Sequence, residues 1–108
     1  MIDRVFSEGV GPLLKPLGFT GRGGLLRKEL WVLEILAGTV DGQFTVGVGT
    51  GGTSWDNCPQ QTTLGHLWKG KPYFWKVANP ADIKPTVEQV TVLVLELALP
   101  WLADSKHP

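Results

Sequence analysis

Hydrophobic residues alternate with other residues along two neighbouring stretches, 30–39 and 43–50, which are separated by Asp41 and Gly42. Alternation with a period of two is typical of β-strands, and an Asp-Gly pair supplies the positive φ angles that a tight type I′ turn needs. The two stretches therefore predict a β-hairpin. Both faces of the first strand are mostly apolar, so we expect it to be central in its sheet and largely covered.

The second strand of this hairpin has two different faces. Large and small residues alternate along it in the order Phe44, Thr45, Val46, Gly47, Val48 and Gly49. We expect the large side chains to pack in the core and the small ones to let another group approach closely. In the first strand, Glu34 is either buried, with a raised pKa if it lacks a partner, or it pairs with Arg27 or Lys28 on a neighbouring strand or faces solvent, and we favour pairing or solvent.

Both ends of the chain have the three- and four-residue spacing of an amphipathic helix. The spacing predicts a helix over 2–17, bent or broken near 8–12 because this stretch contains two glycines and a proline. A second helix is predicted over 86–99, with a break near Pro100. Residues 90–95 also fit a buried strand, and the length of the whole pattern favours the helix.

The remaining segments complete an α+β domain. Strands are predicted near 25–28 and 73–77, a glycine-rich turn over 21–24, and a long loop over 51–71 that has no clear periodicity. Together these patterns predict one domain over residues 1–108. It consists of a single antiparallel sheet of about four to five strands, on which an N-terminal and a C-terminal helix pack.

Composition narrows the classes of function. Hydrophobic residues make up 43% and charged residues 19% of the chain, which is typical of a globular domain. Ten basic residues balance ten acidic ones, so nucleic-acid binding is disfavoured. The lone cysteine, Cys58, cannot form an internal disulfide and fits a reducing compartment. The apolar run at 90–99 is too short to span a bilayer, and residues 2–4 do not begin a signal peptide, so we expect a cytoplasmic protein without membrane contact.

Several short motifs resemble an uncharacterised bacterial family, catalogued as domain of unknown function 4304. They are LLKPLGF at 13–19, the strand led by Trp31, FTVGVG at 44–49, the loop around Cys58, the Leu67-Trp68 pair and LPWL at 99–102. The chain departs from the family pattern at the glycine-rich turn over 21–24 and at LLRK (25–28), which lacks an aromatic residue. The resemblance implies a compact α+β domain with helices on an antiparallel sheet. It implies no established activity, so no functional residue is carried over.

Signals for catalysis or for metal binding are weak. The glycine-rich stretch 47–54 could expose backbone amides to an anion, but it lacks the lysine of a P-loop, and a flexible strand exit is the simpler interpretation. Cys58 and His66 could act as nucleophile and base, with Asp56 orienting the imidazole. Spacing alone gives no geometry for them, and a buried or incidental cysteine with a surface histidine is the simpler interpretation. One cysteine with one internal histidine does not make a closed zinc site. We expect no catalytic residue, metal or cofactor.

Aromatic residues and lysines are interleaved between residues 55 and 76. Such residues suit the centre of an interface, although each one taken singly is more simply explained as core packing. Phe74 points opposite to its two neighbours in a strand, so at least one aromatic side chain should reach a groove or a partner. The candidate binding residues are Trp55, Asp56, His66, Trp68, Lys69, Tyr73 and Trp75.

Two functions follow as hypotheses. The first is a small binding or interaction domain, such as an immunity-type or adaptor protein, which holds a partner protein through the aromatic segment. The alternative is a small-ligand-binding protein or an enzyme that uses a pocket near the glycine-rich strand exit and Cys58 and His66. An enzyme is the less favoured class, and the oligomeric state is open.

Overall fold

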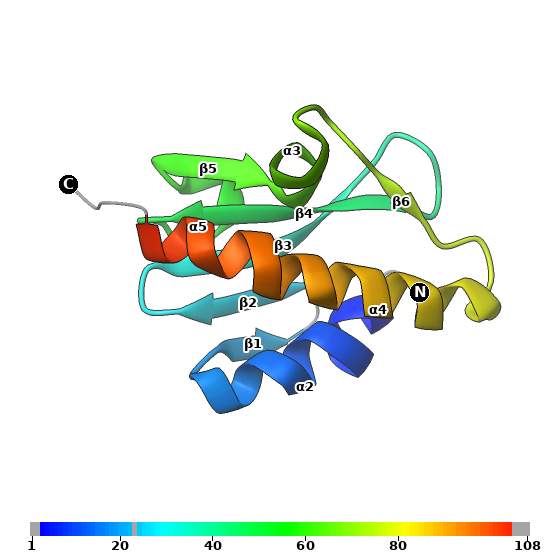
Figure 1. The fold of residues 1–108 in the computed structure, drawn as a ribbon, viewed down its shortest axis with the longest axis horizontal. Coiled ribbons are helices and arrows are strands. Elements are labelled where there is room, and N and C mark those ends of the chain that lie inside the picture. Colours follow the sequence, from blue (N-terminus) through cyan, green and yellow to red (C-terminus); the bar gives the residue numbers. More distant parts are fainter. Residues whose placement is uncertain (1–2, 23, 105–108) are drawn as a thin grey trace.

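The computed structural model describes residues 3–22 and 24–104. One antiparallel sheet is covered on one face by an N-terminal and a C-terminal helix, and the C-terminal helix runs roughly along the direction of the strands (Figure 1). The predicted α+β class, with a single antiparallel sheet and a helix from each end of the chain, is confirmed.

Within residues 3–22 and 24–104 the sheet has six strands, and five of them follow the chain in order. These are β1 (Thr20–Arg22), β2 (Leu25–Lys28), β3 (Trp31–Ala37), β4 (Gln43–Thr50) and β5 (Gln60–Thr63), and β6 (Trp75–Lys76) also pairs with β4. The predicted strands over 25–28 and 43–50 are confirmed. β1 lies where a turn was predicted over 21–24, because an antiparallel strand needs only backbone pairing, here of Gly21 with Leu26. Gly23 of that turn lies outside the described residues.

The hairpin is confirmed, but the predicted type of its turn is wrong. β3 ends at Ala37, and the N–H of Gly38 donates to the Gln43 carbonyl at 2.8 Å. The N–H of Gln43 donates to the Val40 carbonyl at 3.0 Å, so Asp41 and Gly42 are the central residues of a turn within a longer loop. Only Gly42 of this pair has a positive φ, 81°, whereas a type I′ turn needs positive φ at both.

The N-terminal helix runs without a break through its proline. It consists of α1 (Asp3–Val5), a π-helical turn η1 (Phe6–Val10), α2 (Gly11–Leu14) and a 3₁₀ turn η2 (Lys15–Leu17). The predicted break near 8–12 is replaced by the π turn, in which the N–H of Gly11 donates to the Phe6 carbonyl, five residues back. The wider turn makes room for the ring of Pro12, which would otherwise meet a carbonyl one turn back. Ile2, where the helix was predicted to begin, lies outside the described residues.

The C-terminal helix also contains a π-helical turn before a proline, and it is longer than the predicted 86–99. It consists of a 3₁₀ turn η4 (Pro80–Asp82), α4 (Ile83–Leu93), a π-helical turn η5 (Val94–Ala98) and α5 (Leu99–Asp104). The N–H of Leu99 donates to the Val94 carbonyl, again just before a proline, so Pro100 does not end the helix. The alternative of a strand over 90–95 is therefore wrong.

The predicted loop over 51–71 is largely structured. It contains a 3₁₀ turn η3 (Trp55–Asn57), strand β5 and helix α3 (Leu64–Lys69). β5 reads Gln-Gln-Thr-Thr and shows no apolar alternation, and α3 is too short for a helical period. Conversely, the strand predicted over 73–77 is only two residues long, β6. Residues 72–74, which precede it, are not in a strand, and only Trp75 and Lys76 pair with β4.

The core lies between the sheet and the two helices. The largest of its fully buried side chains are Phe6, Leu14, Phe19, Leu33, Phe44, Leu64 and Leu102. Within the described residues, the helix Pro80–Asp104 is 25 residues long and apolar enough to cross a membrane by length and composition, with 33% of its most apolar window buried. Core helices pass the same test, so the expected absence of membrane contact stays a prediction.

Candidate functional site

The face of the sheet away from the two helices is partly covered by the segment 51–59. The small residues of β4 make this close approach possible, because a Cβ at Gly47 would lie 2.6 Å from Trp55 Cδ1 and one at Gly49 would lie 2.8 Å from Cys58 Sγ. Real Cβ atoms do not come so close to a neighbour. The predicted close approach to the small-residue face is thus confirmed, and the approaching groups are Trp55 and Cys58.

Trp55 is fixed to the sheet by two hydrogen bonds. Its backbone N–H donates to Glu34 Oε1 at 2.9 Å, and its indole Nε1–H donates to the Thr62 carbonyl at 2.8 Å. The partner of Glu34 is therefore the Trp55 backbone rather than Arg27 or Lys28, and the carboxylate is half-buried rather than fully solvated. A central strand and an edge strand together hold the ring over Gly47.

Beside Trp55 the outer face is hollowed. The hollow has a volume of about 320 Å³, and we call it the outer hollow. Its lining is contributed by β3, β4, η3, β5, α3 and the segment before β6, namely Leu36, Ala37, Thr45, Trp55, Thr63, His66, Pro72, Tyr73 and Phe74. The volume lies within the range typical of small-molecule sites, which are mostly apolar with a few placed polar groups.

Thr45 is the polar residue at the sheet side of the outer hollow. It lies on β4 between the core residues Phe44 and Val46, so its side chain is directed to the outer face. Only 4% of Thr45 is exposed, and its hydroxyl oxygen is buried without a hydrogen-bond partner. Leaving a hydroxyl buried and unpaired costs about 1–3 kcal/mol, so this atom needs an explanation.

His66 is an exposed residue of the same lining, in the first turn of α3. Thr63 caps this helix, because its Oγ1 accepts the backbone N–H of His66 at 3.2 Å. The same oxygen lies 3.1 Å from Nδ1 of the imidazole. These two contacts hold the ring against the end of β5 and leave Nε2 as the nitrogen that a ligand could meet.

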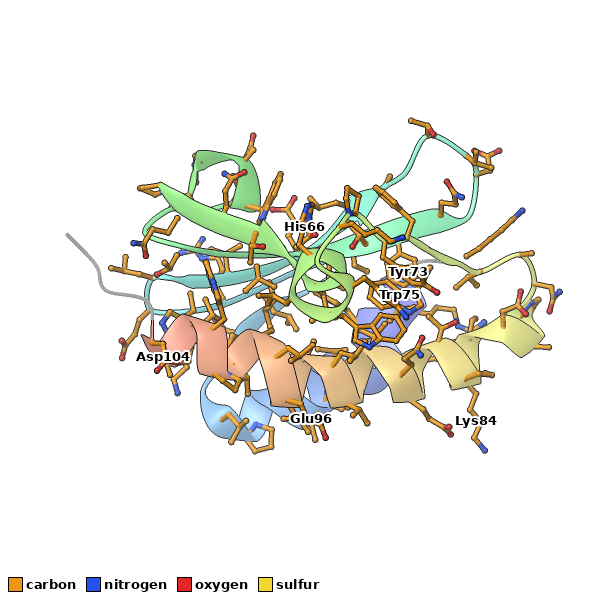
Figure 2. The ribbon with its side chains drawn as sticks, turned by 45° about the horizontal axis from the view of Figure 1, so that its top comes forward. His66, Tyr73, Trp75, Lys84, Glu96 and Asp104 are labelled. Carbon is orange, nitrogen blue, oxygen red and sulfur yellow. The ribbon has the colours of Figure 1, made fainter. Side chains whose placement is uncertain are left out.

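Tyr73 is the third predicted residue that lines the outer hollow, and it also belongs to an aromatic cluster. Its ring packs edge-on against Trp68 and Trp75, each with a centroid distance of 5.1 Å. The Trp68 and Trp75 rings are stacked 6.0 Å apart, and Lys69 Nζ lies 3.9 Å from the Trp68 centroid. Figure 2 shows Tyr73 next to Trp75, with His66 apart from them near α3.

Trp68, Lys69 and Trp75 are therefore outside the lining of the outer hollow. Only 4% of Trp75 is exposed, and its indole Nε1–H donates to Gln89 Oε1 of α4 at 2.7 Å. Phe74, in contrast, is 42% exposed and lines the hollow, as expected if one aromatic residue of this segment reaches a groove. The packing of Trp68 and Trp75 favours a structural role for them.

Cys58 and Asp56 do not meet His66 in the outer hollow. Cys58 is 4% exposed, its Sγ donates to the Ser54 carbonyl at 3.2 Å, and burial raises the pKa of its thiol. Asp56 is exposed and accepts a hydrogen bond from the Ser54 hydroxyl. A buried thiol with a raised pKa is a poor nucleophile, so the hypothesis of a Cys58–His66 pair is wrong.

Backbone N–H groups of the glycine-rich strand exit are already used in hydrogen bonds within the protein. Asn57 Oδ1 accepts the backbone N–H groups of Thr53 and Ser54, at 2.9 and 3.0 Å. These amides cannot cradle an anion while Asn57 holds them, and the Asp56 carboxylate next to Asn57 would repel one. Within residues 3–22 and 24–104, no three His, Cys, Asp or Glu side chains gather where they could hold a metal ion.

Sequence patterns alone missed six residues of the outer hollow as site residues: Leu36, Ala37, Thr45, Thr63, Pro72 and Phe74. A signal for two of them was present. The small-residue face of the strand over 43–50 contains Thr45, and the alternation after Tyr73 directs Phe74 away from the core. Leu36 and Ala37 lie at the end of β3, a strand expected to be covered on both faces, so its pattern did not single them out. Thr63 and Pro72 are brought to the site by β5 and by the path of residues 72–74, which have no periodic pattern.

A second hollow lies beside the C-terminal helix. It has a volume of about 390 Å³ and lies between η2, the strands β2 and β3 and the end of the helix. Lys28 is its charged lining residue, and its Nζ lies 5.5 Å from the centroid of Trp31. It contains no predicted site residue and no buried polar atom that lacks a partner, so it is the weaker candidate.

The fold and the outer hollow define a class of molecule: a small α+β domain with helices on one face of its sheet and an apolar hollow on the other. No protein-family model, curated protein or solved structure matches the chain. The resemblance to domain of unknown function 4304 therefore stays a prediction, and the argument for function depends on the site itself.

Proposed function

We propose that this protein is a small binding domain that takes a compact, apolar ligand into the outer hollow. The observation that carries the proposal is the Thr45 hydroxyl, which is buried and unpaired in the wall of an apolar hollow of about 320 Å³. A ligand that pairs with this hydroxyl would offset the cost of burying it. This is the ligand-binding form of the alternative function that the sequence suggested.

The residues around the hollow support binding rather than chemistry. Trp55 is held by hydrogen bonds to β3 and β5, so its ring is fixed in place before a ligand arrives. Phe74 stands at the surface, where it can cover a ligand. His66 lies among the lining residues without a carboxylate or a thiol beside it in that lining.

The test is an NMR titration with toluene and with p-cresol, following the indole N–H signal of Trp55. We expect both compounds to shift this signal in the native protein. Leu36 pairs with Thr45 across β3 and β4 and lines the hollow, so Leu36→Phe places a ring there and should abolish the shift. Leu30→Phe adds a ring at an exposed position outside the hollow and should leave the shift unchanged. If neither compound moves the Trp55 signal, the proposal is wrong.

A second candidate function is the capture of a partner protein, as the aromatic segment suggested. One observation favours it: Phe74 is 42% exposed, and exposed aromatic side chains are frequent at the centres of interfaces. The matched variants are Phe74→Ala and Trp68→Ala, since Trp68 packs against the core instead. A partner whose recovery in a pull-down is lost with Phe74→Ala and kept with Trp68→Ala would support this function. Equal recovery with both variants would contradict it.

A further inference from the structure

We infer that the outer hollow selects a neutral aromatic compound of one or two fused rings, with a hydrogen-bonding group directed at the Thr45 hydroxyl. This inference rests on the proposed function and adds to it the chemical class of the ligand. Charge, shape and the position of the unpaired hydroxyl each contribute one part of the argument.

The lining of the outer hollow disfavours a charged ligand. None of the described residues that line it is Asp, Glu, Lys or Arg, and its titratable side chains are His66 and Tyr73. A carboxylate or ammonium group that entered the hollow would lose its hydration, and no permanently charged side chain of opposite sign in the lining would compensate for this loss. The nearby carboxylate of Glu34 already accepts the Trp55 backbone N–H. The ligand is therefore neutral.

The walls favour a flat ring. Three of the lining side chains, Trp55, Tyr73 and Phe74, are aromatic and come from two separate segments. Rings pack well against other rings in stacked or edge-on arrangements, as Tyr73 already does against Trp75. A cavity of about 150 Å³ holds benzene. The outer hollow, at about 320 Å³, therefore suits one ring or two fused rings.

Thr45 determines how the ligand is oriented, because the hydrogen-bonding group of the ligand must face this hydroxyl. Its hydroxyl can both donate and accept a hydrogen bond, and within the described chain it does neither. Valine has the same shape without the hydroxyl. Thr45→Val should therefore stabilise the free protein while it weakens binding, a combination that a purely structural threonine would not produce.

The experiment compares three probes that share a methyl-substituted ring: p-cresol, toluene and p-toluate. We expect p-cresol to bind about fivefold more tightly than toluene, because one net hydrogen bond contributes about 1 kcal/mol. We expect p-toluate to bind at least about tenfold more weakly than p-cresol, because its charge is left without a partner. Affinities come from NMR titrations that follow the Trp55 indole N–H.

Two variants assign the preference to Thr45. In Thr45→Val the affinity for p-cresol should fall to that for toluene, the affinity for toluene should stay the same, and the melting temperature should rise. Thr45→Ser keeps a hydroxyl and should keep the preference for p-cresol. Equal binding of p-cresol and toluene by the native protein would overturn this inference and leave the proposed function standing. Binding of p-toluate as tight as that of p-cresol would overturn the neutral class, whereas no binding by any probe would overturn both proposals.

Discussion

At the scale of single residues, the outer face depends on a few polar contacts that fix apolar side chains. Glu34 is an example, since a carboxylate on a central strand would be costly there without a partner. Its Oε1 accepts the Trp55 backbone N–H and so ties the segment 51–59 to β3. This one hydrogen bond therefore gives the half-buried carboxylate a partner and also positions Trp55 in the lining of the outer hollow.

Removing this carboxylate should loosen the covering segment. We expect Glu34→Ala to lower the free energy of unfolding by about 1–3 kcal/mol, because it leaves the half-buried Trp55 N–H unpaired. Urea denaturation measures the change. Glu34→Gln keeps an acceptor oxygen and should cost less. Glu88→Ala, at an exposed position of α4, should change stability by no more than about 0.5 kcal/mol. A loss in Glu34→Ala as small as that in Glu88→Ala would contradict the role given to Glu34.

Cys58 predicts how stability depends on alkaline pH. Burial raises the pKa of its thiol above the ordinary value of 9.0, and the charges of Glu34 and Asp56 add to the effect. Below that ordinary value the thiol is neutral in both the folded and the unfolded chain, so it causes no pH dependence. As the pH rises further, the unfolded chain loses this proton first and the free energy of unfolding falls.

Urea denaturation at about pH 8 and about pH 10 measures this loss. Cys58→Ala lacks the thiol and should lose less stability than the native protein between the two conditions. The comparison uses the change within each protein, so the packing cost of the substitution cancels. Equal losses in the two proteins would show that Cys58 does not contribute.

At the scale of elements, the two long helices approach each other closely through a glycine. Gly9 lies in η1, and a Cβ added there would overlap Val87 Cγ1 of α4. Alanine favours a helix over glycine by about 1 kcal/mol, but overpacking costs about 1–3 kcal/mol. We therefore expect Gly9→Ala to destabilise the protein in urea denaturation.

A double-mutant cycle tests the cause of this loss. Val87→Ala removes the methyl groups that the new Cβ would meet, so adding it to Gly9→Ala should restore part of the stability. We expect a coupling energy of about 0.5–3 kcal/mol between the two positions. Additive losses without coupling would mean that the helices do not meet at Gly9 and Val87.

The elements with a regular pattern could be predicted from the sequence, and the others could not. The two hairpin strands predicted over 30–39 and 43–50 and both terminal helices follow from periodicity. The strand β5 and the helix α3 do not, because Gln-Gln-Thr-Thr has no apolar alternation and six residues are too few for a helical period. The π turns before Pro12 and Pro100 were also missed, since a proline ordinarily indicates a break.

The same difference explains the candidate site. Trp55, His66 and Tyr73 could be predicted because their side-chain types suit binding, and the structure brings all three to the outer hollow. Trp68 and Trp75 have equally suitable side chains, but they pack on each other and on the core. Which aromatic residues stay accessible depends on how α3 and β6 dock at the edge of β4, and no local pattern encodes that.

At the scale of the whole molecule, both helices lie on one face of the sheet, which leaves the other face for the outer hollow (Figure 1). The Cα radius of gyration is 12.8 Å, close to the value of about 13 Å for a compact domain of this length. The C-terminal helix belongs to this compact unit, because Val90, Val94, Ala98 and Leu102 along its length are all in the core. Lys84 and Glu96 on the same helix point away from the sheet (Figure 2).

Because one core joins the C-terminal helix to the sheet, we expect the helix and the sheet to unfold together. Trp75 reports on this core, since its ring lies 5.9 Å from that of Phe44 and its indole is hydrogen-bonded to Gln89 of α4. Far-ultraviolet circular dichroism and tryptophan fluorescence should therefore give the same urea midpoint, as in a two-state transition. Trp55→Phe removes the signal of the covering segment, and the midpoints should still coincide in that variant. If the fluorescence midpoint came at lower urea than the helical signal, the C-terminal helix would be stable without the core that holds it here.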